Sequence, residues 1–85
     1  MFKITCITGD GETVTLKIEG RIVGRWVDEL QRECEKCLAT HSKLVIDLSG
    51  VSFIDDQGVK ALKGMMGDRT RLTGHSLFLS GLLDG

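Results

Sequence analysis

The 85-residue sequence contains no proline, no tyrosine and only three cysteines. Three cysteines are too few for a disulfide framework, which favours a reducing compartment, and we expect the protein to be cytoplasmic. The 11 basic residues are balanced by 12 acidic ones, so there is no basic excess of the kind that indicates nucleic-acid binding. No apolar run approaches the roughly 18 residues that a membrane-spanning helix needs. The sequence therefore predicts neither nucleic-acid binding nor membrane insertion.

The apolar pattern of the first half predicts a hairpin followed by a helix. Apolar and polar residues alternate over residues 2–7 and 13–19, which indicates two strands. The glycines and aspartate at 9–12 favour a turn between them. From 25 to 40, apolar residues recur every three or four positions, and this spacing predicts a helix with one apolar face.

The second half predicts a strand, a helix and a final strand. Residues 43–48 are mostly apolar without alternation, which is typical of a central strand buried on both faces. A turn is expected at 49–50, and Asp55 is a suitable N-cap for a second helix that continues to Leu72. Residues 75–80 would form the last strand. The order β-β-α-β-α-β predicts an α/β domain, with a mixed four-stranded sheet and both helices on one face.

The Cys-x-x-Cys motif formed by Cys34 and Cys37 is the strongest candidate for chemistry from spacing alone. A redox cysteine needs a helix N-terminus to lower its pKa, but this pair lies in the C-terminal half of the predicted helix. We interpret both residues as part of the core. The alternatives are a small redox protein, or a zinc site completed by Cys6 and either His41 or His75, although only one Cys-x-x-Cys half-site exists.

Two further patterns are candidates for catalytic sites. Asp55 and Asp56 are adjacent at a helix start, so their carboxylates point in different directions and are poorly placed to share a proton. Gly50 and Gly58 have neither the spacing nor the following lysine of a phosphate-binding loop. We therefore expect no catalytic residue, no metal and no cofactor, and we expect that the protein is not an enzyme.

Residues 44–59 read Leu-Val-Ile-Asp-Leu-Ser-Gly-Val-Ser-Phe-Ile-Asp-Asp-Gln-Gly-Val, and this segment resembles the signature of STAS domains. That family includes domains of sulfate transporters and anti-sigma-factor antagonists. Its pattern is a buried strand ending in Asp-Leu, a short apolar loop, and Asp-Ser-x-Gly opening a helix. Residues 18–22 also resemble the family's second strand and its glycine. The resemblance implies a single STAS-like domain over residues 1–85 that lacks the usual C-terminal helix-strand-helix, and we expect a homodimer to cover the gap.

The resemblance also implies a function. In anti-sigma-factor antagonists, the serine directly after the motif's aspartate is phosphorylated by a partner kinase that is also the anti-sigma factor. Asp56 stands at that position and has no hydroxyl, and Val23 stands where antagonists often carry an aspartate. We expect a non-catalytic interaction module of bacterial signal transduction and transcription regulation that binds a regulatory kinase, an anti-sigma factor or a similar partner. The alternative is an adaptor subunit beside the ATPase of a lipid-trafficking ABC transporter.

The same resemblance predicts where the partner binds. A helix N-terminus and the loop before it present free backbone N–H groups, and in this family that region recognises protein partners. The predicted partner-binding residues are Ser52, Phe53, Asp55, Asp56, Gln57 and Gly58.

Overall fold

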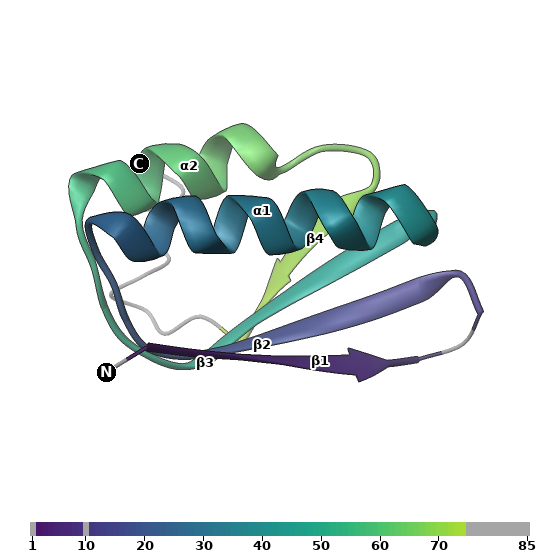
Figure 1. The fold of residues 1–85 in the computed structure, drawn as a ribbon, viewed down its shortest axis with the longest axis horizontal. Coiled ribbons are helices and arrows are strands. Elements are labelled where there is room, and N and C mark those ends of the chain that lie inside the picture. The colour runs from purple at the N-terminus through teal and green to yellow at the C-terminus, as the bar shows by residue number, and fades with distance from the viewer. Residues whose placement is uncertain (1, 10, 75–85) are drawn as a thin grey trace.

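A computed structural model describes residues 2–9 and 11–74 of the chain (Figure 1). Its elements are β1 (Phe2–Thr8), β2 (Thr13–Ile22), α1 (Arg25–Thr40), β3 (Lys43–Ile54), α2 (Asp56–Met65) and β4 (Thr70–Thr73). The strands lie in the order β1-β2-β3-β4, with β1 antiparallel to β2 and the other neighbours parallel. Both helices lie on the same side of the sheet. The predicted mixed sheet with two helices on one face is confirmed.

The core lies between the helices and one face of the sheet. Alternate residues of the two central strands point into it and are almost fully buried: Val14, Leu16, Ile18, Leu44, Ile46 and Leu48. The helices contribute Val27, Leu30, Cys34, Cys37, Ala61 and Leu62. The prediction that β3 is buried on both faces is wrong, because Val45 and Asp47 face the other side and are only half-buried. No described element covers that face.

β3 runs continuously through residues 49–50, where the sequence predicted a turn. Its pairing with β2 shifts register at two places. The pairs on either side of the shifts are Lys17 with Asp47 and Glu19 with Gly50, then Gly20 with Val51 and Arg21 with Phe53. In each shift β3 contains one residue more than β2, so each shift is a bulge that keeps the strands paired while bending β3.

The predicted extension of the second helix to Leu72 is also wrong. α2 ends at Met65, and Leu72 lies in β4, where it pairs with Ile46 of β3. Gly64 and Gly67 explain the early end, because each glycine lowers helix stability by about 1 kcal/mol relative to alanine. The strand predicted at 75–80 lies outside the described residues.

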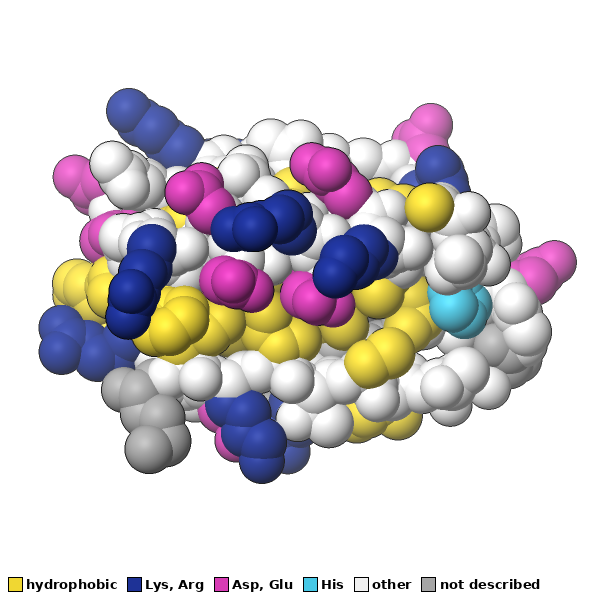
Figure 2. Space-filling view, viewed as in Figure 1, with side chains coloured by type: hydrophobic (Ala, Val, Ile, Leu, Met, Phe, Trp, Pro, Cys, Tyr) yellow, Lys and Arg dark blue, Asp and Glu magenta, His cyan; other side chains and the backbone are white. Residues whose placement is uncertain are grey.

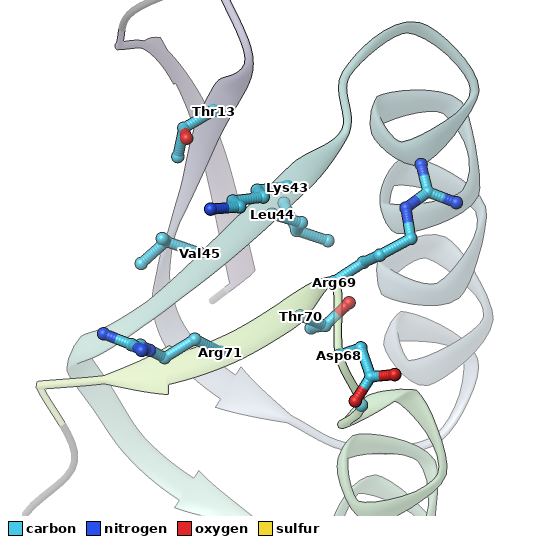
Figure 3. Close-up of a pocket in the computed structure, with 9 residues that line it drawn as sticks. Thr13, Lys43, Leu44, Val45, Asp68, Arg69, Thr70 and Arg71 are labelled. Carbon is cyan, nitrogen blue, oxygen red and sulfur yellow. The ribbon is translucent and has the colours of Figure 1, made fainter.

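The C-terminus of α1 is capped by Arg69, which belongs to the connection between α2 and β4. The last turn of α1 contains no basic residue of its own. The Arg69 guanidinium donates hydrogen bonds to the backbone oxygens of Leu38 (2.6 Å), His41 (2.9 Å) and Ser42 (3.0 Å), and its side chain extends toward that helix end in Figure 3. A cation at this position satisfies carbonyls that lack intrahelical partners and matches the negative end of the helix dipole.

Candidate functional site

The N-terminus of α2 lies at the corner where β2 and β3 end (Figure 1). The last residues of these strands, Ile22 and Ile54, are paired with each other and buried. The backbone N–H of Asp55 donates to the backbone oxygen of Ile22 at 3.1 Å, and α2 begins at the next residue. The first turn of the helix is therefore fixed on the ends of the two central strands.

The Asp55 carboxylate joins two segments at this corner. One oxygen accepts a hydrogen bond from the backbone N–H of Gly58 at 2.7 Å, which confirms the predicted N-cap. The other oxygen accepts from the backbone N–H of Gly24 at 3.0 Å. Gly24 is the N-cap residue of α1, and its φ of 55° lies in the region that favours glycine. A single carboxylate thus completes the start of α2 and ties the start of α1 to it.

Gly58 allows α2 to approach the strand ends closely. A Cβ atom at this position would lie 2.6 Å from Cγ2 of Ile54, 3.0 Å from the backbone oxygen of Ile22 and 3.1 Å from Cγ2 of Ile22. The first separation is too short for non-bonded atoms and the other two are tighter than most Cβ contacts, so only glycine fits without displacement of the neighbours. Gly58, predicted as a partner-binding residue, is buried and holds the corner in shape.

Four of the six predicted residues are exposed to solvent. Asp56 and Gln57 are exposed in the first turn of α2, and the Phe53 side chain is exposed even though it is large and apolar. The Arg21 guanidinium lies over the Phe53 ring, 5.2 Å from its centroid, which is a cation–π geometry. Ser52 is exposed as well, but its hydroxyl donates to the backbone oxygen of Gly20. We call the surface formed by Arg21, Phe53, Asp56 and Gln57 the α2 corner.

A shallow groove between the two helices continues from this corner. It has a volume of about 570 Å³ and is lined by Val27, Asp28, Gln31, Gln57, Lys60 and Ala61. Gln57 therefore belongs both to the α2 corner and to the groove. Sequence reasoning missed the groove and Arg21, because the bulges of β3 and the packing of the two helices decide which side chains become neighbours there. The glycine motif at residues 18–22 was the one sequence signal close to Arg21.

The Cys-x-x-Cys motif lies in the core, on the face of α1 that packs on the sheet. Cys34 is 2% exposed and Cys37 is 8% exposed, while Cys6 of β1 is exposed. Burial, with smaller contributions from Cys37, Glu33 and Glu35, raises the pKa of Cys34 to about 12. Burial, together with Cys6 and Glu33, also raises the pKa of Cys37. A raised pKa suppresses the reactive thiolate, which supports the interpretation of both cysteines as core residues.

We expect the thiols of the native protein to react in two classes. In dilute protein, Cys6 should be labelled rapidly by a thiol reagent, whereas Cys34 and Cys37 should be labelled only as fast as the domain opens. Raising the pH from neutral toward 9 should leave the labelling of Cys34 slow, because burial raises the pKa of its thiol to about 12. Time-resolved labelling with mass spectrometry would measure each rate. Rapid native labelling of Cys34 would contradict the assignment to the core.

Another hollow lies away from the α2 corner, beside the first residues of β3 and β4. It has a volume of about 350 Å³, and Lys43, Arg69 and Arg71 contribute basic side chains to its lining. In Figure 3, Arg69 points to the opposite side of the strands from Lys43 and Arg71, so the three cations do not converge. Within residues 2–9 and 11–74, no three His, Cys, Asp or Glu side chains are grouped to hold a metal ion. No helix in the same ranges has the length and hydropathy to cross a membrane.

The protein is thus a small α/β domain whose candidate site, the α2 corner, is an exposed surface at a helix N-terminus. The family model for the STAS domain matches residues 6–84. The chain therefore belongs to the STAS domain family, which confirms the resemblance inferred from residues 44–59.

Solved structures of anti-sigma-factor antagonists share the fold. The antagonist SpoIIAA in its unphosphorylated form superimposes with a TM-score of 0.75 at 20% identity, covering 99% of this chain and 82% of that one. An antagonist from Mycobacterium paratuberculosis gives a TM-score of 0.69 at 25% identity, covering 85% of this chain and 64% of that one. A STAS-domain antagonist from Rhodobacter sphaeroides gives 0.59 at 21% identity, covering 86% of each chain. A search of curated proteins found no match.

Proposed function

We propose that this STAS domain is a non-catalytic interaction module of the anti-sigma-factor-antagonist type, and that it binds a regulatory kinase or anti-sigma factor through the α2 corner. One observation carries the proposal. Asp56 is exposed in the first turn of α2, directly after the Asp55 N-cap, at the position that the family resemblance gives to the phosphorylated serine. The α2 corner also supplies an exposed aromatic ring and a cation beside it, and aromatic and arginine side chains are frequent binding hot spots.

Asp56 gives the α2 corner a permanent charge. An aspartate carries one negative charge, against about 1.5 to 2 for a phosphoserine, and lacks its third acceptor oxygen. The negative charge lies in the first turn of α2, at the positive end of the helix dipole, where an acidic side chain stabilises the helix. In this proposal the module is not switched by phosphorylation at residue 56, and its binding follows the amount of partner present.

Reversing the charge of Asp56 should weaken partner binding. We expect the Asp56→Lys variant to lose affinity for the kinase or anti-sigma factor by about tenfold to a hundredfold, as for a charge at a protein interface. The partner would first be isolated by pull-down from native lysate, and affinities would then be measured by calorimetry. Asp68→Lys is the matched control, because Asp68 is exposed beyond the other end of α2.

Two outcomes would contradict the proposal. Unchanged affinity of a folded Asp56→Lys variant would place the interface elsewhere. Recovery of a transporter ATPase as the specific partner, with no regulatory kinase or anti-sigma factor, would favour the adaptor function instead. An Asp56→Ser variant adds a positive test, because a kinase partner that recognises the α2 corner should phosphorylate this variant and not the wild type.

A further inference from the structure

β1 is an edge strand with little of the usual protection against pairing. It is first in the sheet order and, among the described residues, has a neighbouring strand on one side only. Its seven residues pair with β2 without a register shift, so no bulge twists the edge away. It contains no proline and one charged residue, Lys3. Native proteins normally blunt an exposed edge with such features, so the free backbone groups of β1 are available to a further strand.

A groove with four apolar and two acidic lining residues runs beside this edge, between β1 and α1. The ring of Phe2 stacks on that of Trp26, with centroids 5.2 Å apart and planes 12° apart. Phe2 and Ile4 are only partly buried, and Cys6 is exposed. The groove, of about 260 Å³, is lined by these four residues together with Glu29 and Glu33. Figure 2 shows a band of hydrophobic side chains along this boundary, beneath the charged outer surface of α1.

The charges of α1 above the groove form a self-complementary row. The row reads acid, base, acid, base: Glu29, Arg32, Glu33 and Lys36. Glu29, Arg32 and Lys36 are exposed and Glu33 is partly exposed. The four side chains form two ion pairs within the helix, Glu29–Arg32 at 4.0 Å and Glu33–Lys36 at 3.7 Å. If a second α1 lay antiparallel beside the first, with a twofold axis at the middle of the row, every charge would face an opposite one. Glu29 would face Lys36 of the second copy, and Arg32 would face Glu33.

We propose that the chain forms a twofold dimer in which β1 pairs antiparallel with β1 of a second copy while the two α1 helices lie side by side. A second copy fits this surface because it supplies an edge strand with equally little protection, an equal groove and the complementary charge row. A uniformly basic or acidic partner would meet like charges in the row. The contact is isologous, so it closes on itself. None of its residues belongs to the α2 corner, so the dimer leaves that surface free and its test is independent of the proposed function.

Charge reversal distinguishes a second copy from any other occupant. Sedimentation velocity over a wide concentration range should show a dimer for the wild type. The single variants Glu29→Lys and Lys36→Glu each place like charges across the axis, and each should raise the dimer dissociation constant by about tenfold. An equimolar mixture of the two variants should form a heterodimer with nearly wild-type affinity, because both cross-axis pairs are again opposite in sign. The matched controls are Asp68→Lys and Lys63→Glu. Both residues are exposed and lie outside β1 and α1, so these charge reversals should leave the dimer unchanged.

Cys6 supplies a second, independent measurement. Its labelling rate should fall as the concentration of wild-type protein rises, and in the Glu29→Lys variant the fall should occur at about tenfold higher concentration. The proposal is overturned if the wild type is monomeric at every concentration, or if both single variants dimerise as the wild type does. A mixture of the variants that fails to restore association would overturn the antiparallel arrangement of the helices.

Discussion

Replacing Gly58 with alanine should lower the free energy of unfolding by about 2 kcal/mol. The added methyl group would meet a backbone oxygen and two isoleucine methyl groups within 3.1 Å, and overpacking of this kind costs about 3 kcal/mol when backbone is among the obstacles. Alanine recovers about 1 kcal/mol of this through its higher helix propensity. Urea denaturation monitored by circular dichroism would measure the difference.

The same substitution at Gly64 is the control. Gly64 lies in the same helix, and a Cβ atom there would have no neighbour within 4 Å. Gly64→Ala should therefore stabilise the domain by up to about 1 kcal/mol. The two variants should move the denaturation midpoint in opposite directions. A stabilising Gly58→Ala variant would show that α2 does not approach the ends of β2 and β3 as closely as described.

Removing the Asp55 carboxylate should cost about 2 kcal/mol of stability. Loss of an N-cap alone costs about 1 kcal/mol, and Asp55→Ala also leaves the backbone N–H of Gly24 without its charged acceptor, which adds about 1 kcal/mol. The cost should be shared between the starts of both helices. Hydrogen exchange would detect this as lower protection in the first turns of α1 and α2.

Two related variants test that mechanism. Asp56→Ala alters the neighbouring, exposed carboxylate, and its effect should be limited to the loss of a favourable dipole interaction, about 0.5 kcal/mol. Asp55→Asn keeps one acceptor oxygen for two N–H donors. The free energy of unfolding of this variant should therefore lie between those of the wild type and Asp55→Ala. Equal stabilities of the Asp55→Ala and Asp56→Ala variants would contradict the double role of Asp55.

The element order and the core face could be predicted from the sequence because both depend on local periodicity. Alternation placed Val14, Leu16 and Ile18 on one face of β2, and the three-to-four spacing placed Leu30 and Cys34 on the inner face of α1. The N-cap role of Asp55 is also local, because its acceptor lies three residues from the N–H that it binds.

The errors concern features that depend on distant partners. Residues 49–50 resemble a turn when read alone, and only their pairing with β2 makes them part of a bulged strand. β4 has only four residues, which is too short for its apolar pattern to predict a strand. These residues form a strand because they pair in parallel with β3. At the candidate site, Asp55 and Gly24 are 31 positions apart. Arg21 lies beside Phe53 because the two bulges of β3, which precede this pair, shift the register of β3 against β2.

The cap that Arg69 places on α1 has a consequence for the order in which the domain can open and close. Arg69 also accepts, through its backbone oxygen, the N–H of Leu44 at 2.7 Å, so the same residue binds the end of α1 and the start of β3. The last turn of α1 gains this cap only when the chain has returned 27 to 31 residues later and docked beside β3. These three segments should therefore unfold as one cooperative unit, and the helix end should not fray on its own.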